Sequence, residues 1–317
     1  MVKTKQPRRL EPIRPGSAAY VRKRIAESWQ WYLLLLPALA YNIIFHYVPM
    51  YGILMAFQRY SPSKGIAGSK WIGFENFLRF FRNPYFWKMI TNTLSITLLS
   101  LLTFPCSILF ALFLNEVTHT KFKKVAQMIS YMPHFLSEVV VVSLTLLMLD
   151  LSSGPINNLL DAMGQERIYF MGQPTMFPPI YVLSGLWQGL GWGAILYISA
   201  LSAVPVEQVE AARIDGASRF QVMMNINLPS ILPTIMITLL MRMGRIMSLG
   251  YTKILLMEND LIKDATNVIS TYTYRIGIVG GQYSYATAIG LFNNLINIAL
   301  LLAFNQLSKK LTDISLF

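Results

Sequence analysis

Six stretches of this sequence are long and apolar enough to cross a membrane as helices. A helix needs about 20 consecutive apolar residues to span roughly 30 Å of hydrocarbon. Stretches of that length occupy residues 31–57, 90–114, 125–149, 180–203, 227–249 and 284–304. Only 13% of the residues are charged, against about 25% in a soluble domain, so lipid must provide part of the solvent. The sequence therefore predicts an all-α fold, a polytopic membrane bundle of six transmembrane helices.

The basic residues follow the pattern of a membrane protein with a cytoplasmic amino-terminal tail. Eight of the 27 Lys and Arg residues lie among the first 30 residues: Lys3, Lys5, Arg8, Arg9, Arg14, Arg22, Lys23 and Arg24. This concentration beside the first span matches the positive-inside rule, and six spans place both termini in the cytoplasm. We expect residues 1–27 to form a basic cytoplasmic tail and residues 28–317 to form the membrane domain. The net charge of +12 then needs no nucleic acid as a partner.

One segment fits this topology less well than the others. Residues 59–88, between the first two spans, carry six Lys and Arg residues and many aromatic side chains. We interpret this segment as an amphipathic piece lying in the outer membrane interface. The alternative is that the segment is cytoplasmic and the topology differs.

The sequence lacks the motifs of common catalytic and nucleotide-binding sites. It contains no Gly-x4-Gly-Lys-Ser/Thr loop for nucleotide phosphates, no nucleophile elbow and no His-Glu-x-x-His pair. Cys106 is the only cysteine, which excludes an internal disulfide and a metal cluster built from cysteines. We expect no catalytic residue, no metal and no cofactor in this chain, and therefore no enzyme.

The loop between the fourth and fifth spans, residues 204–229, contains the most specific pattern in the sequence. From Pro205 it reads Pro-Val-Glu-Gln-Val-Glu-Ala-Ala-Arg-Ile-Asp-Gly, and it ends in Ile-Asn-Leu-Pro. A proline suits the start of a helix, Glu207 and Glu210 suit its early turns, and Gly216 permits a sharp turn. We predict a helix, a break and a second helix, with a first helix whose paired alanines let another surface approach closely.

This pattern resembles the coupling motif of membrane subunits of ATP-binding-cassette (ABC) importers. That motif is Glu-Ala-Ala, three residues, Gly, nine residues, Ile, one residue and Leu-Pro, and every specified position is present. Softer similarities to the maltose-permease-like branch of type I importers, which serves oligosaccharides and polysaccharides, extend over residues 28–317. The resemblance implies a cytoplasmic coupling helix whose ATPase-contacting residues are Glu210, Ala211, Ala212, Asp215 and Gly216.

The same resemblance implies a function and a set of partners. The chain would be a multi-pass permease subunit in the bacterial cytoplasmic membrane, forming half of the pathway for an oligosaccharide. Its partners would be a second permease subunit of different sequence, two ABC ATPase subunits that bind ATP and Mg, and an extracellular or periplasmic solute-binding protein. Two other functions remain open, a permease for a non-sugar solute and a secondary transporter driven by an ion gradient.

Polar side chains within the spans are costly in lipid and are therefore candidates for the substrate pathway. In the fourth span, Trp187, Gln188 and Trp192 combine stacking surfaces with an amide, and the resemblance to maltose-type permeases favours Gln188 and Trp192 as sugar contacts. The alternative is close helix packing at the neighbouring glycines, with tryptophans at an interface. In the sixth span, Asn293 and Asn297 share one helix face. They contact sugar, as the resemblance implies, or form hydrogen bonds between helices.

Arg242 and Arg245 lie three residues apart toward the outer half of the fifth span. Their guanidinium groups could bind an acidic sugar, pair with Glu138 or extend toward the outer interface. The first of these roles places Arg245 in the predicted substrate pathway.

Overall fold

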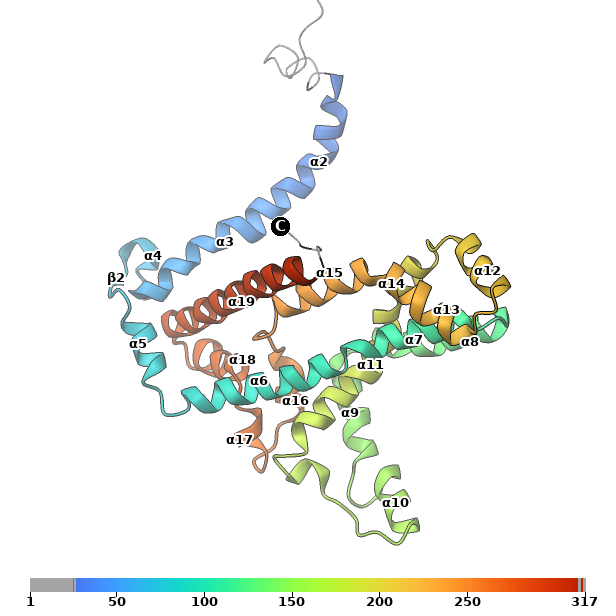
Figure 1. Ribbon diagram of the computed structural model, residues 1–317. Coiled ribbons are helices and arrows are strands. Elements are labelled where there is room, and N and C mark those ends of the chain that lie inside the picture. Colours follow the sequence, from blue (N-terminus) through green and yellow to red (C-terminus); the bar gives the residue numbers. More distant parts are fainter. Residues whose placement is uncertain (1–24, 26, 313–314, 316–317) are drawn as a thin grey trace, which may run out of the picture. The chain divides into compact units, whose positions relative to one another are not determined.

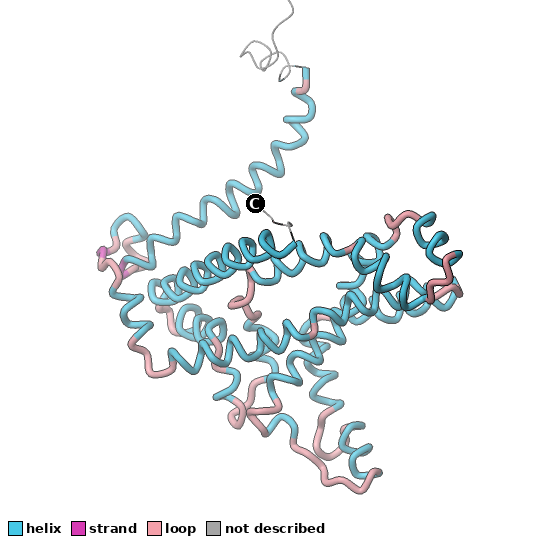
Figure 2. The backbone as a smooth tube through the Cα atoms, viewed as in Figure 1, coloured by secondary structure: helices cyan, strands magenta, loops and turns pink. Residues whose placement is uncertain are grey.

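The computed structural model describes residues 25, 27–312 and 315, and the regular structure of this part is helical apart from one short hairpin (Figure 1). Figure 2 shows that the hairpin strands, β1 (Gln58–Arg59) and β2 (Lys70–Trp71), are the exception among helices and loops. The chain divides into two units, Met1–Leu54 and Met55–Phe317. Nearly all of the predicted cytoplasmic tail, residues 1–27, lies outside the described residues.

The described part of the first unit is one apolar helical stretch with an exposed surface. Helix α2 (Trp29–Asn42) continues through a π-helical turn (Ile43–Tyr47) into α3 (Val48–Met50), and a 3₁₀ turn (Tyr51–Phe57) leads into the second unit. No residue of α2 is buried. The whole stretch, Trp29–Phe57, is long enough to cross a membrane. An apolar surface of this size is stable only against lipid or another protein chain.

The second unit contains two further long helical spans. One comprises α6 (Phe86–Leu102) and α7 (Phe104–Glu116), and the other lies within α19 (Tyr283–Thr312). Three bent helix pairs also pass as spans by length and composition. They are Thr120–Phe135 with Glu138–Met148, bent by 104°, Phe177–Leu201 with Val206–Ile214, bent by 79°, and Arg219–Ser230 with Leu232–Met243, bent by 60°. With each pair counted as one span, the described residues contain six spans in the predicted order, and the predicted all-α membrane bundle is confirmed.

The remaining helices either make up the bent pairs or lie in the connections. The helices of the bent pairs are α8 (Thr120–Tyr131), α9 (Glu138–Met148), α11 (Phe177–Leu201), α12 (Val206–Ile214), α13 (Arg219–Val222), α14 (Leu228–Ser230) and α15 (Leu232–Met243). The connecting helices are α4 (Gly65–Gly68), α5 (Glu75–Phe81), α10 (Pro155–Ala162), α16 (Tyr251–Met257), α17 (Lys263–Thr266) and α18 (Ile269–Tyr274). Single turns of other helical types occur at Met132–Phe135, Phe170–Gly172, Met223–Asn227 and Arg275–Val279.

Two predicted spans are not straight helices. The span predicted at 125–149 breaks after the turn that contains Pro133, because Leu136 is extended and Ser137 begins a new helix. The Ser137 hydroxyl accepts a hydrogen bond from the Val140 N–H at 3.4 Å, which caps α9. The span predicted to end at residue 249 ends instead at Met243, and an irregular segment leads from there to α16.

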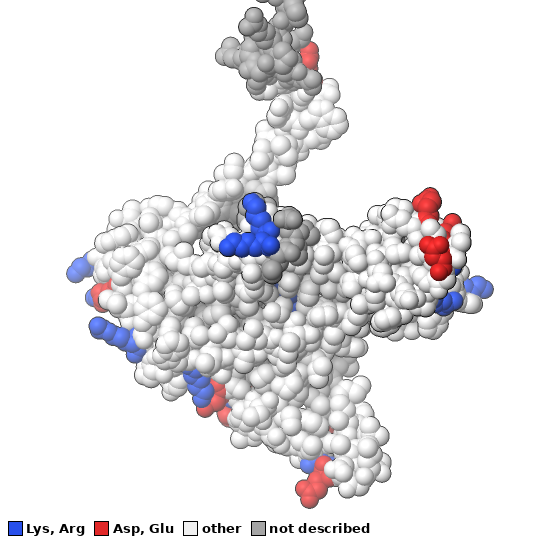
Figure 3. Space-filling model, in the orientation of Figure 1, with Lys and Arg blue, Asp and Glu red and all other residues white. Residues whose placement is uncertain are grey.

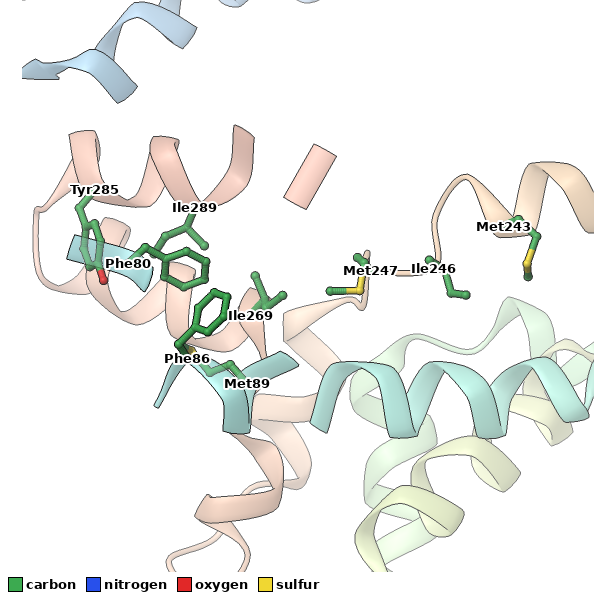
Figure 4. Packing of buried hydrophobic residues seen from close by; sticks show 9 residues of the cluster. All are labelled: Phe80, Phe86, Met89, Met243, Ile246, Met247, Ile269, Tyr285 and Ile289. Atoms are coloured by element: carbon green, nitrogen blue, oxygen red, sulfur yellow. The ribbon is translucent and has the colours of Figure 1, made fainter. Parts of the chain in front are cut away.

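Buried apolar clusters hold the helices of the second unit together. One cluster joins α5, α6, α18 and α19 to the segment after α15, as Figure 4 shows: Phe80, Phe86, Met89, Met243, Ile246, Met247, Ile269, Tyr285 and Ile289. A second cluster packs α7 against α11 and α15: Ile108, Ala111, Leu112, Ala194, Tyr197, Leu201, Met223, Ile231 and Ile235. The clusters join the long helices and also include residues at their breaks, such as Ile231 and Ile246.

Charged side chains avoid the middle of the spans on the face shown in Figure 3. Acidic atoms gather over α12, whereas the surface over the middle of α6 and α7 is uncharged. The sequence itself has no charged residue between Lys88 and Glu116. This distribution is the one expected of a surface that faces hydrocarbon.

A buried amide ties α19 to the irregular segment after α15. The side-chain oxygen of Asn297 accepts the Met247 N–H at 2.9 Å, and its NH₂ group donates to the Ser248 hydroxyl at 2.8 Å. Asn297 is only 5% exposed. Asn297 therefore bonds to the irregular segment after α15, and its role as a sugar contact stays a prediction.

We predict that Asn297→Ala lowers the thermal stability of the purified chain in detergent. The substitution leaves the buried Met247 N–H without its acceptor, which costs about 1–3 kcal/mol. The matched control is Asn294→Ala, because Asn294 is an exposed neighbour on the same helix. Equal melting temperatures for the two variants would contradict a stabilising role for the Asn297 hydrogen bonds.

Candidate coupling helix and membrane cavity

Helix α12 leaves the end of α11 at a sharp angle and projects an exposed surface. Pro205 precedes its first residue, Glu207 lies in its first turn, and none of its residues is buried. The exposed side chains include apolar ones, with Ile214 86% exposed and Val206 63% exposed. Exposed apolar side chains beside carboxylates are typical of a surface that binds another protein.

The backbone at Gly216 ends α12 and redirects the chain. Gly216 has φ +84°, a left-handed conformation that glycine adopts without steric cost. Its N–H donates to the Arg213 carbonyl at 3.1 Å, and the Ala217 N–H donates to the Ala212 carbonyl at 2.9 Å. These two bonds form a Schellman motif. The predicted sequence of a helix, a break and a second helix is therefore present.

The second helix of the loop is capped and anchored to α7. Ser218 and Gln221 form a capping box at the start of α13. After the π-helical turn at Met223–Asn227, the Asn227 side-chain NH₂ donates to the Glu116 carboxylate at 3.2 Å. Asn227 is buried, so this bond links the loop to the end of α7.

A polar cavity of about 400 Å³ lies among the middle parts of the spans. Its walls come from the junction of α6 and α7, from α11, from the end of α15 and from α16. Three glycines of α11 line it at intervals of four residues, Gly185, Gly189 and Gly193. A Cβ atom at Gly189 would meet no atom within 4 Å. The backbone of Gly189 is therefore directly accessible from the cavity.

Two cations and one amide line this cavity. The Arg242 guanidinium donates to the Ser100 carbonyl at 2.6 Å. The Lys253 ammonium donates to the Tyr181 carbonyl at 3.1 Å and lies 4.8 Å from the centre of that tyrosine ring. Lys253 is only 6% exposed. Gln188 donates from its NH₂ group to the Leu136 carbonyl at 3.1 Å, at the bend between α8 and α9.

The predicted substrate-pathway residues do not all meet in this cavity. Gln188 lines it, but Trp192 instead stacks on His134, with ring centres 4.3 Å apart and planes 6° apart. Trp187 lines a separate apolar groove between α9 and α11. Arg245 is exposed and lines none of the cavities described, and neither it nor Arg242 forms an ion pair with Glu138. Of the two arginines, Arg242 is the one that reaches the cavity.

Asn293 lies at a second cavity, of about 520 Å³, beside the stacked rings of Tyr251 and Tyr274. Its side-chain oxygen is buried and has no hydrogen-bond partner among the described residues. Asn293 and Asn297 therefore share a helix but have different surroundings. Asn293 keeps an acceptor free, whereas both groups of the Asn297 amide are used.

Lys253 is the cavity residue that our sequence reasoning missed. It follows the predicted fifth span, and the sequence alone did not place it in the substrate pathway. The available signal was the run Tyr-Thr-Lys-Ile-Leu-Leu-Met at Tyr251–Met257, a single lysine among mostly apolar residues. A lone cation in such a run is a candidate functional residue in a membrane protein. The described residues contain no group of three or more potential metal-ligating side chains.

Comparisons with known proteins identify relatives along most of the chain. Residues 103–313 match the family described as binding-protein-dependent transport system inner membrane component. The chain is 42% identical over 287 residues to protein LplB of Bacillus subtilis (strain 168), covering 90% of each chain. It is 41% identical over 280 residues to the polygalacturonan/rhamnogalacturonan transport system permease protein YteP of the same organism, covering 88% of this chain and 87% of the relative.

A solved structure agrees with these sequence matches. One chain in the crystal structure of a bacterial ABC transporter in complex with alginate pentasaccharide-bound periplasmic protein superposes with a TM-score of 0.84. Its sequence identity is 38%, and the match covers 93% of this chain and 99% of that one. The six-span arrangement is therefore shared with a membrane subunit of known structure.

We predict that alanine substitution destabilises the bundle at Gly191 but not at Gly189, two residues away on α11. A Cβ atom at Gly191 would lie 2.3 Å from the Ser130 carbonyl oxygen, so Gly191→Ala should destabilise the bundle by about 1–3 kcal/mol through overpacking. Gly189→Ala should fold normally because that position faces open space. Size-exclusion profiles and melting temperatures in detergent measure both effects, and equal behaviour would contradict the packing described.

Proposed function

The chain belongs to the family of binding-protein-dependent transport system inner membrane components, and from this premise we propose that it is one of two membrane subunits of an ATP-driven oligosaccharide importer. The single observation that carries the proposal is the exposed helix α12, which bears the complete coupling pattern and ends at Gly216 with φ +84°. A helix held outside the bundle by a capped turn suits a contact with a separate motor subunit.

In this function, α12 is the contact with the ATPase. Glu210 pairs with a basic group on the ATPase, since charge complementarity orients such contacts. Ala211 and Ala212 allow the two surfaces to approach closely. Asp215 and Gly216 set the turn that ends α12 and leads into α13. The ATPase subunits bind ATP and Mg, and this chain contributes no nucleotide site.

Movement of α12 can reach the cavity through contacts present in the structure. The loop continues from α12 through α13 to Asn227, which holds the Glu116 carboxylate at the end of α7. Helix α7 packs on α11 through a buried cluster. On the same pair of helices, the Ser107 hydroxyl donates to the Leu190 carbonyl at 3.1 Å, at the cavity wall. These rigid elements couple a displacement of the loop to the shape of the cavity.

The assembly needs further chains. The exposed apolar surface of α2 and a cavity formed by one subunit suit a second permease, which we propose to be a different sequence. A solute-binding protein outside the membrane delivers the oligosaccharide, as the periplasmic protein in the alginate transporter structure suggests. We place the chain in the bacterial cytoplasmic membrane with both termini in the cytoplasm.

Relatives support an oligosaccharide as the solute. One matching structure is of a transporter for alginate, described there as an acidic polysaccharide, and one similar permease serves polygalacturonan and rhamnogalacturonan. The polar cavity, with the Gln188 amide and open glycine backbone, suits a polyhydroxylated ligand. If the solute is not a sugar, the transporter should import it in uptake assays, and added saccharides should not compete with this import.

We predict that Gly216→Val uncouples ATP hydrolysis from uptake in the reconstituted transporter. A β-branched residue at φ +84° is strained by about 1–2 kcal/mol, so α12 loses its geometry while the spans stay folded. Glu210→Lys should have the same effect by reversing the charge. Gly164→Val is the matched control, because Gly164 has a similar φ of +73° in the loop after α10. Uptake that survives in Gly216→Val but is lost in Gly164→Val would contradict the assignment of α12.

A further inference from the structure

We propose that the cavity lined by Arg242, Lys253 and Gln188 is a carboxylate-binding site for a uronate residue of the transported saccharide. This inference rests on the proposed function, because it names the class of solute that the same pathway carries. Three features of the cavity support it: its charge, its unused hydrogen-bonding capacity and the open backbone in its wall.

The cavity holds two positive charges and no negative one. None of its 13 lining residues is Asp or Glu. Glu138 acts on Lys253 electrostatically, but it forms no ion pair with Lys253 and does not line the cavity. Arg242 lies in the span that contains α15, and Lys253 is buried in the connecting helix α16. Cations in such surroundings are costly, and they usually pair with an anion or mark a ligand site. A carboxylate entering the cavity would provide the missing negative charge.

Both cations are oriented by the backbone and keep donors free. Arg242 uses one donated bond, to Ser100, of the five that a guanidinium can make. Lys253 uses one, to Tyr181, of three. These hydrogen bonds to carbonyl oxygens hold the guanidinium and ammonium groups at the cavity without neutralising their charges. An arginine so placed can bind a carboxylate through two parallel hydrogen bonds, and the lysine adds a point charge.

The remaining walls suit the rest of a sugar ring. The side-chain oxygen of Gln188 has no hydrogen-bond partner among the described residues and can accept from a hydroxyl. The backbone of Gly189 is also open to the cavity, because a Cβ atom there would meet no atom within 4 Å. A volume of about 400 Å³ lies within the usual range for sites of small ligands. The geometry therefore fits one acidic sugar unit.

An anionic lipid headgroup shares this chemistry, because its phosphate would also bind Arg242 and Lys253. We favour the saccharide because the cavity is lined by the junction of α6 and α7, in the middle of the span Phe86–Glu116, and by the middle part of α11, whereas headgroups lie at the membrane surface. Analysis of lipid that copurifies with the transporter separates the two sources.

The test uses the assembled transporter with its binding protein in proteoliposomes. The probes are tetrasaccharides of galacturonate, glucuronate, mannuronate and guluronate, each as the free acid and as the neutral methyl ester, together with a neutral glucan tetrasaccharide. We expect uptake of at least one acid to exceed that of its ester. Arg242→Gln should reduce uptake of this acid by about tenfold or more, as expected for one lost charge-assisted hydrogen bond. Arg242→Lys should recover part of it, and Lys253→Met should also reduce it.

The Arg245→Gln variant is the control that distinguishes loss of this site from a general loss of positive charge. Arg245 lies three residues from Arg242 but does not line the cavity, so its substitution should reduce acid uptake far less. Equal losses in the two variants, or equal uptake of acid and ester by the unaltered transporter, would overturn the proposal. So would a loss of bound anionic phospholipid in Arg242→Gln with acid uptake unchanged, because the cavity would then be a lipid site.

Two further outcomes are also decisive. Uptake of the neutral glucan alone, driven by ATP, would overturn the carboxylate site while leaving the proposed importer function intact. Absence of uptake for every probe, together with no ATP hydrolysis in response to the loaded binding protein, would contradict the importer function itself. The two failures are therefore distinguishable.

Discussion

Inside lipid, every backbone N–H and C=O group must find its partner within the protein, and this constraint explains where the polar side chains of the spans lie. A break in a helix frees backbone groups, and at three places an intramembrane polar side chain bonds to a backbone group near such a break. Gln188 donates to Leu136 at the bend before α9, and Asn297 accepts from Met247 after α15. Arg242 donates to Ser100 beside the junction of α6 and α7. Side chains that look like ligand contacts in the sequence therefore also hold the broken helices in place.

The same arrangement gives the cavity its chemistry. The neutral amide of Asn297 bonds to the Met247 N–H and the Ser248 hydroxyl, whereas Arg242 and Lys253 each give one hydrogen bond to a carbonyl and retain both charge and donors. A push on α12, passed through Asn227 and Glu116 to α7, would act on the helices that form the cavity. The proposed ligand site and the proposed coupling route therefore both lie at interruptions of the helices.

Much of this architecture could be predicted from the sequence. Apolar runs located the six spans because hydrophobic length is a property of the chain alone, and the pattern around Gly216 located α12 because its turn needs a specific residue. The bend of 104° after Pro133 could not be predicted, since prolines also occur in continuous membrane helices. The partners of Trp192 and Asn297 depend on tertiary packing, and Lys253 was missed because it lies beyond the apolar run, in a segment that folds back to the cavity. The roles of the coupling and pathway residues remain predictions.

The most direct test of the account is uptake of a radiolabelled oligosaccharide into proteoliposomes with ATP and Mg trapped on the cytoplasmic side. The chain is reconstituted alone in one sample, and with the second permease, the ATPase subunits and the binding protein in the other. The account predicts uptake only in the complete assembly, only with hydrolysable ATP, and none by the chain alone under a proton or sodium gradient. Uptake by the isolated chain on an ion gradient, without ATP, would contradict the claim that it forms half of an ATP-driven pathway.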